Sequence, residues 1–140
     1  MTQSKANLEQ LMMLLDEAHK LSSPIREWIE RGISDWLSGK SMDAALGLSS
    51  LPGQRSPATR LRVAMRDSEL RRAWELVDAT SPWKRSVALA ERIERLEPVY
   101  RGHRSGRPPT SAVNRRLCAA RDWCRLPTAA TRLHEICSMS

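Results

Sequence analysis

Three Ser-Pro pairs, Ser23-Pro24, Ser56-Pro57 and Ser81-Pro82, constrain the fold of this 140-residue chain more than any other feature. A serine before a helix accepts a hydrogen bond from a free backbone N–H of the first turn. A proline in that turn supplies a helical φ and lacks an amide hydrogen that would have no partner there. Val, Ile and Thr together number only 16 and alternate with polar residues in no convincing window. The sequence therefore predicts an all-α fold.

Apolar residues recur at three- and four-residue steps over seven segments, which is the period of a helix. The expected helices cover about residues 7–20, 24–38, 42–46, 57–78, 82–97, 111–124 and 129–138. Pro98 is expected to end the fifth of them. With 17 Leu, 5 Ile, 5 Val and no Phe, the core must be thin and must use Ala, Met and Trp. We expect a compact bundle of about five to seven helices.

Residues 99–110 combine arginines with two glycines and two prolines, a composition typical of an exposed basic linker. This segment divides the chain into a helical bundle at 1–98, the linker at 99–110 and a C-terminal helical hairpin at 111–140. A single compact domain is the alternative organisation, since 140 residues are one domain's worth of sequence.

Charge is distributed unevenly along the chain. The net charge is +7, yet residues 1–53 hold 5 basic and 7 acidic residues, whereas residues 54–140 hold 18 and 9. Nineteen of the 23 cations are Arg, whose guanidinium binds phosphate or carboxylate with two parallel hydrogen bonds. We expect the C-terminal arginines to form a single cationic patch that faces a polyanion.

Catalysis, metal binding and cofactor binding have little support in the sequence. The three histidines lie in no nucleophile motif, and six glycines form no phosphate-binding loop. Cys118, Cys124 and Cys137 lack the paired spacing of a zinc site, and their odd number argues against a disulfide framework. We expect reduced thiols, no metal, no cofactor and no enzymatic activity.

The segment Gly106-Arg107-Pro108 resembles the Gly-Arg-Pro arms of invertase and resolvase DNA-binding domains and the core of an AT-hook. The resemblance covers three to five residues. It implies an extended arm whose arginines enter a narrow minor groove of negative potential. The predicted nucleic-acid contacts in this segment are Arg101, Arg104 and Arg107.

The two helices that follow, at about 111–124 and 129–138, resemble a helix-turn-helix pair. This resemblance implies that the exposed start of the second helix meets base edges. The alternative is an ordinary helical hairpin with a charged surface and no DNA-binding role. The predicted nucleic-acid contacts of the pair are Arg115, Arg116, Arg121, Arg125, Thr131 and Arg132.

The acidic N-terminal segment concentrates large apolar residues, including Trp28, Ile29 and Trp36 on one predicted helix. Two interpretations are open. The first two helices can complete the core by packing on the fourth and fifth, which we favour because few other large residues can fill it. Alternatively, these three residues anchor an interface with a second copy or with a protein partner.

These features together indicate a small accessory or regulatory protein of bacterial or phage type that binds nucleic acid, with duplex DNA favoured. The alternative is a helical inhibitor or adaptor that docks on an acidic or nucleic-acid-binding partner. We expect a cytoplasmic location and no membrane association. No run of residues approaches the ~18 apolar residues of a membrane span, and residues 1–23 lack the features of a signal peptide.

Overall fold

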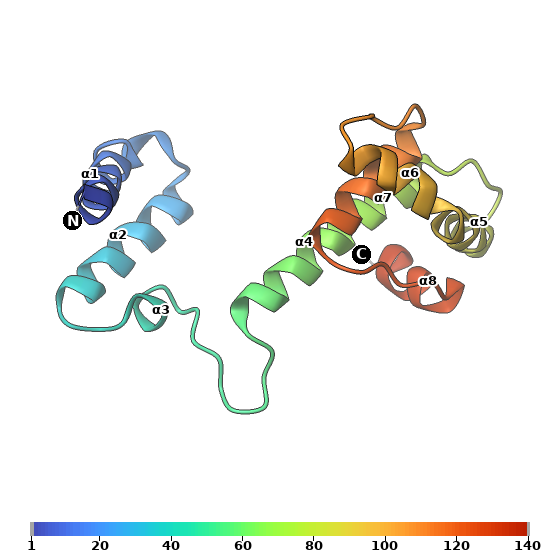
Figure 1. Cartoon of the computed structure of the whole chain (residues 1–140). Coiled ribbons are helices and arrows are strands. Elements are labelled where there is room, and N and C mark those ends of the chain that lie inside the picture. Colours follow the sequence, from blue (N-terminus) through green and yellow to red (C-terminus); the bar gives the residue numbers. More distant parts are fainter. Residues whose placement is uncertain (1, 140) are drawn as a thin grey trace. The chain divides into compact units, whose positions relative to one another are not determined.

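The computed structural model describes the backbone of residues 2–139 and the side chains of residues 7–139. Within this range every regular element is a helix, which confirms the all-α prediction. The chain separates into two compact units, which we call unit 1 (Met1–Pro57) and unit 2 (Ala58–Ser140). The division therefore falls near residue 57 rather than at the predicted boundary of residue 98. Figure 1 shows the helices of each unit.

Unit 1 contains the helices α1 (Thr2–Asp16), α2 (Ser23–Leu37) and α3 (Met42–Ala45), with a short 3-10 turn at Ala18–Lys20. The first Ser-Pro pair starts α2 one residue earlier than predicted, because Ser22 is the N-cap and Pro24 lies in the first turn. α3 packs against α2. A Cβ atom at Gly32 of α2 would overlap Cδ2 of Leu46, so glycine permits this close approach.

Unit 2 contains α4 (Pro57–Leu76), α5 (Pro82–Glu94), α6 (Leu96–Arg104), α7 (Ala112–Trp123) and α8 (Ala130–Ser138). The predicted cap at Ser81 is confirmed, and Ser111 at the start of the predicted 111–124 helix caps α7. Ser81 Oγ accepts from the Lys84 amide at 3.2 Å, and Ser111 Oγ accepts from the Asn114 amide at 3.3 Å. The described residues hold eight α-helices, one more than the predicted range allows. The extra helix arises because the predicted 82–97 helix is interrupted at Arg95, after which α6 begins.

The predicted basic linker at 99–110 is wrong for its first half, since residues 99–104 belong to α6. Pro98 does not stop a helix. It lies in the first turn of α6, where a missing amide hydrogen costs nothing. α6 ends at Arg104, and Gly106, which follows the C-cap Ser105, has a φ of +89°, a conformation that favours glycine. The Gly106 amide donates to the His103 carbonyl at 3.1 Å, and the Arg107 amide donates to Gly102 at 2.8 Å.

The predicted C-terminal hairpin is also corrected. α8 packs principally against α5, and α7 packs against α6 (Figure 1). The backbone turns extended at Cys124, with φ −170° and ψ 176°, and the following segment leads the chain away from α7. Leu126 in this segment is buried in the core, which fixes the path of the connection.

The hydrophobic core of unit 2 is one cluster that combines all five helices. Its buried members are Leu70, Ala73, Val77, Leu89, Ala90, Ile93, Leu96, Val113, Leu117, Cys118, Ala120, Leu126, Leu133, Ile136 and Cys137. None of them comes from unit 1, so unit 2 has a core of its own.

Candidate nucleic-acid interface

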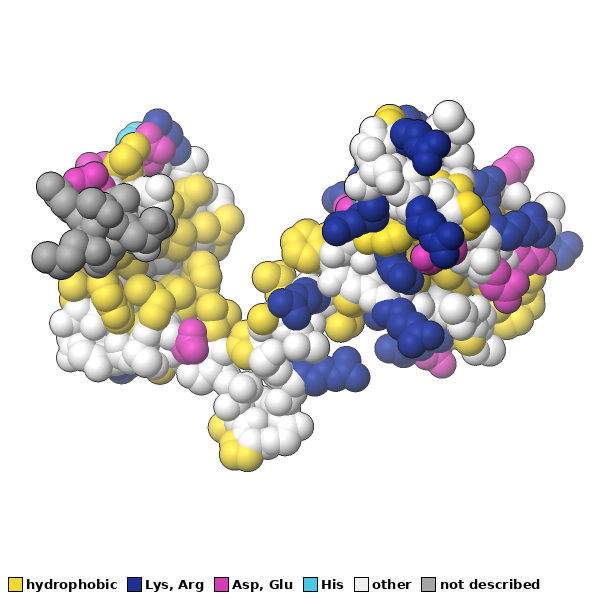
Figure 2. All heavy atoms as spheres, in the orientation of Figure 1, with side chains coloured by type: hydrophobic (Ala, Val, Ile, Leu, Met, Phe, Trp, Pro, Cys, Tyr) yellow, Lys and Arg dark blue, Asp and Glu magenta, His cyan; other side chains and the backbone are white. Residues whose placement is uncertain are grey.

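The net positive charge of the chain resides in unit 2. It holds 17 basic and 9 acidic residues, whereas unit 1 holds 6 and 7. Figure 2 shows Lys and Arg side chains distributed over the visible face of unit 2, with carboxylates beside some of them. A polyanion would therefore be attracted to unit 2, and the local arrangement of carboxylates decides where it can bind.

Four of the eight predicted arginines are partly neutralised by carboxylates of the same unit. The ion pairs are Arg101–Glu97 at 3.7 Å, Arg116–Glu69 at 3.3 Å, Arg121–Glu97 at 4.0 Å and Arg132–Glu135 at 3.0 Å. From the same helix, Arg116 reaches α4 and Arg121 reaches α6. The expectation that the C-terminal arginines form a single uncompensated patch is therefore wrong.

The other four predicted arginines are exposed and make no ion pair within the described residues. They are Arg104, Arg107, Arg115 and Arg125. The backbone of Arg107 is fixed in place, because its amide completes the C-terminal cap of α6. The segment Gly106-Arg107-Pro108 is therefore a helix terminus rather than a free extended arm, and a DNA contact by Arg107 would have to start from this fixed position.

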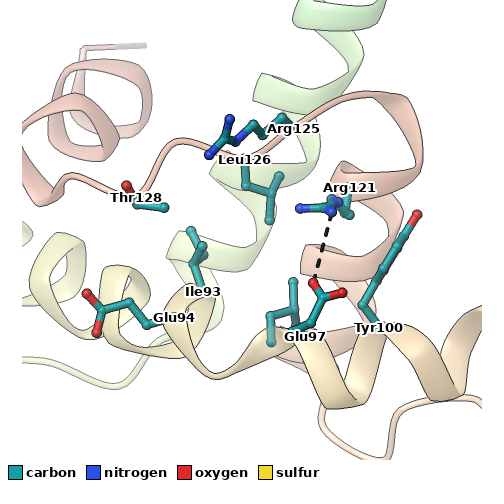
Figure 3. A pocket seen from close by; sticks show the side chains of 9 residues that line it. Ile93, Glu94, Glu97, Tyr100, Arg121, Arg125, Leu126 and Thr128 are labelled. Carbon is teal, nitrogen blue, oxygen red and sulfur yellow. Dashed lines mark ion pairs between the residues drawn. The ribbon is translucent and has the colours of Figure 1, made fainter.

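A hollow of about 220 Å³ lies between α5, α6, α7 and the segment that precedes α8. Figure 3 shows Arg121 pointing toward Glu97, with Tyr100 beside them and Arg125 on the far side. The Arg121 guanidinium carbon lies 5.2 Å from the centre of the Tyr100 ring, within cation–π range. Glu94 also lines the hollow. Carboxylates and guanidinium groups thus share this surface, which makes it a poor site for an anion.

Asp122 of α7 holds α6 in place through two hydrogen bonds. Tyr100 donates its hydroxyl hydrogen to Oδ1 at 3.0 Å, and His103 Nε2 lies 2.8 Å from Oδ2. Burial, together with the hydrogen bond to the Asp122 carboxylate, raises the pKa of Tyr100 above 10.0. The phenol is thus a protonated donor at neutral pH. This cluster has a structural role, because it joins two helices that pack directly on each other.

A second groove lies between the end of α5, the start of α6 and the start of α7, and it contrasts with the first. We call it the α5–α7 groove and define it by its lining residues Arg92, Arg95, Val99 and Asn114. Its volume is about 310 Å³, and no carboxylate lines it. Arg92 Nη1 donates to Ser111 Oγ at 3.1 Å, and the same hydroxyl caps α7. The Arg92 guanidinium therefore lies at the N-terminus of a 12-residue helix, and Arg95 lines the same groove.

The electrostatics of the α5–α7 groove favour an anion. The N-terminus of a helix carries a partial positive charge and presents backbone N–H groups without partners. The first turn of α7 contains no acidic residue that would compensate this charge. Cations beside such a terminus raise the local potential further, and a bound phosphate would accept hydrogen bonds from both sources.

Our sequence prediction missed Arg92 and Arg95 and included their neighbour Arg115, which follows Asn114 on α7. The available signal was a pair of arginines spaced by three residues in the last turn of a predicted helix, just before a proline. Such a pair shares one helix side. The sequence does not reveal that α7 starts beside this side.

The exposed start of α8 holds Thr131 and Arg132, as the helix-turn-helix resemblance requires, but Arg132 is paired with Glu135. In unit 1, the indole N–H of the predicted interface residue Trp28 donates to the Leu46 carbonyl at 2.9 Å, while 41% of Trp28 stays exposed. Ile29 and Trp36 are half-buried.

Several other polar side chains of unit 2 lie in its core or against it. Ser86 is fully buried, accepts from the Trp74 indole at 3.1 Å and lies 3.3 Å from His134 Nδ1. Burial raises the pKa of Cys118, and raises the pKa of Cys137 to about 11, so both thiols are protonated at neutral pH. Within residues 2–139, no three His, Cys, Asp or Glu residues are grouped as metal ligands.

Comparisons with known proteins return no family model, no curated protein and no solved structure that matches this chain. The helices of the described residues include none with the length and apolar character to cross a bilayer. The site must therefore be interpreted from its own geometry.

Proposed function

We propose that unit 2 binds nucleic acid, with duplex DNA as the favoured form, and that the α5–α7 groove is the centre of contact. The observation that carries this proposal is the meeting of Arg92, Arg95 and the N-terminus of α7 around a groove that no carboxylate lines. The role we propose is binding in an accessory or regulatory function, without catalysis.

The chemistry of the groove suits a phosphate diester. Arginine forms paired hydrogen bonds to phosphate oxygens, and the amide of Asn114 adds a neutral donor. Duplex DNA presents one negative charge per about 1.7 Å of helix axis, so phosphates beside the first one are available to neighbouring cations. Arg115 on α7 and the unpaired Arg104 and Arg107 at the end of α6 are candidates for these contacts.

The proposal is tested by fluorescence anisotropy of a labelled random-sequence duplex at several salt concentrations. We expect the log of the wild-type affinity to fall linearly with log salt, by about 0.9 per phosphate contacted. The variant Arg92→Gln/Arg95→Gln should bind roughly tenfold more weakly and should reduce the salt slope by about 2.

The matched control is Arg101→Gln/Arg132→Gln, which removes the same charge from the same unit but affects arginines already paired with carboxylates. We expect a smaller loss from the control. Affinity that does not change with salt would exclude phosphate contacts. An equal loss in both double variants would show that net charge, rather than the α5–α7 groove, governs binding.

An acidic protein partner is the second candidate function, and one observation favours it. Six arginines of unit 2 already bind carboxylates within the chain, so carboxylate groups of another protein can meet the same geometry. Titration with poly-glutamate at the same salt concentration distinguishes the two candidates. Binding of poly-glutamate as tight as binding of the duplex would favour the protein partner.

A further inference from the structure

The first half of α7 lies between two grooves of unit 2. One is the α5–α7 groove, to which α7 contributes Asn114. The other, which we call the α4–α7 groove, has a volume of about 440 Å³. Its lining residues, none of them acidic, are Leu76, Ala112, Arg115, Arg116 and Ala119. Asn114 is two residues from both Ala112 and Arg116, so it lies on nearly the opposite side of the helix from them. The two grooves therefore flank this part of α7.

Glu69 of α4 holds Arg116 in position without cancelling the positive charge beside the α4–α7 groove. Its carboxylate accepts from Arg72 Nη1 at 3.2 Å and from Arg116 Nη1 at 3.3 Å. The side chain of Glu69 is 13% exposed, whereas those of Arg72 and Arg116 are 56% and 44% exposed. One carboxylate between two guanidinium groups leaves one positive charge. Each guanidinium has five N–H donors, so donors that Glu69 does not use remain for a ligand.

Cations on both sides of an exposed helix match the geometry of the major groove of DNA. That groove is about 12 Å wide and admits one α-helix, with a phosphate backbone on either side of it. Arg92 and Arg95 lie on one side of α7, and Arg116 lies on the other. The minor groove is about 6 Å wide, too narrow for a helix about 10 to 12 Å across. The major groove of duplex RNA is deep and narrow, so side chains cannot read it.

Resting on the proposed function, we infer that the first half of α7 enters the major groove of B-form DNA and that Arg115 contacts the edges of guanine bases. Arg115 is exposed, lies between the two sides of α7 and makes no ion pair within the described residues. A free guanidinium forms two parallel hydrogen bonds with O6 and N7 of guanine, which is the commonest specific contact in this groove. Ala112 and Ala119 beside it are small, so the helix backbone can approach the bases closely.

The helix-turn-helix resemblance would give this role to α8 instead. At the exposed start of α8, Arg132 is paired with Glu135, whose side chain is 59% exposed. An exposed carboxylate at this position would face the phosphates of a bound duplex. The first half of α7 carries no acidic residue, so it suits the polyanion better.

The test uses three duplexes of the same G·C sequence and measures the affinity of the full chain by fluorescence anisotropy. In the second duplex 7-deazaguanine replaces guanine, which removes the N7 acceptor from the major groove and leaves the phosphate charge unchanged. In the third, inosine replaces guanine, which removes the N2 amino group from the minor groove and keeps O6 and N7. We expect the 7-deazaguanine duplex to bind about fivefold more weakly than the first, and the inosine duplex to bind as well as the first.

Two variants assign the base contact to one residue. Arg115→Ala should bind all three duplexes with the same affinity, because the side chain that distinguishes them is gone. Alanine also favours the helix, so the circular-dichroism spectrum should match that of the wild type. The matched control is Arg107→Ala, which removes another exposed and unpaired charge of unit 2. It should weaken binding to every duplex by the same factor and keep the fivefold discrimination.

The results separate this inference from the proposed function. Salt-dependent binding that ignores 7-deazaguanine would keep the proposed function and overturn the contact of α7 with guanine. Weaker binding of the inosine duplex alone would place the protein in the minor groove and would also overturn it. Discrimination that persists in Arg115→Ala would show that another residue reads the base. Absence of salt-dependent binding to any duplex would overturn both proposals.

Discussion

The two units use the same helical pattern with opposite results. Unit 2 buries fifteen hydrophobic side chains in one cluster, whereas Ala18 and Ile33 are the buried hydrophobic residues among those described in unit 1. Both units show apolar residues at three- and four-residue steps. An amphipathic pattern therefore predicts that a helix forms, but not that its apolar side finds a partner within the chain.

The difference has a geometric cause. In unit 2, α8 packs on α5 and α7 packs on α6, and Leu70 and Ala73 of α4 belong to the same core. Unit 1 has α1, α2 and only the four-residue α3, which covers one side of α2. A unit with so little internal packing gains little free energy from burial.

The largest expected effect is a difference in the free energy of unfolding between the alanine variants of two leucines, one from each unit. Leu133 of α8 is fully buried, whereas Leu51 is 68% exposed. Leu133→Ala should lower the free energy of unfolding by about 2 to 5 kcal/mol, because it removes packed atoms and leaves a cavity. Leu51→Ala should change it by less than about 0.5 kcal/mol. Urea unfolding followed by circular dichroism measures both, and similar effects would contradict the contrast between the units.

A pH titration probes the core of unit 2 specifically, because unit 1 contains no cysteine. Burial raises the pKa of Cys137 to about 11, whereas a thiol in an unfolded chain has a pKa of about 8.5. The unfolded chain therefore ionises first as pH rises. The contribution of Cys137 to stability is complete below about pH 8 and is lost between about pH 8.5 and pH 11.

We expect the loss from Cys137 to reach about 3 kcal/mol at pH 11. Unfolding by urea at pH 7, 9 and 10.5 measures it. The variant Cys137→Ala should show a correspondingly flatter dependence of stability on pH. An unchanged slope in Cys137→Ala would show that this thiol is not buried as described.

The smallest expected effect separates a helix end from a flexible arm. Gly106 has a φ of +89°, so Gly106→Ala should destabilise unit 2 by about 1 kcal/mol. Gly102 lies inside α6, where an added Cβ would meet Arg107 only at ordinary contact distances of 3.8 Å or more. Gly102→Ala should therefore be neutral or stabilising by up to about 1 kcal/mol. Thermal unfolding measures the stability of both variants. Equal stabilities of Gly106→Ala and Gly102→Ala would favour a flexible arm at Gly106.

Local chemistry made several elements predictable. The Ser81 and Ser111 caps were found because the capping hydrogen bond spans only three residues. Pro98 and Gly106 were misread for a related reason. Each residue fits two local roles, and only the presence of α6 shows that Pro98 begins a helix and Gly106 ends one.

The sequence by itself determined the all-α class, most helix starts and the concentration of arginine after residue 53. These properties depend on neighbouring residues and on composition. Only the tertiary structure decided which arginines find carboxylates on other helices, as Arg116 meets Glu69 across 47 positions of sequence. It likewise brought Arg92 and Arg95 of the α5 end to the start of α7. Charge partners and shared grooves depend on how helices pack, and sequence spacing alone does not encode that geometry.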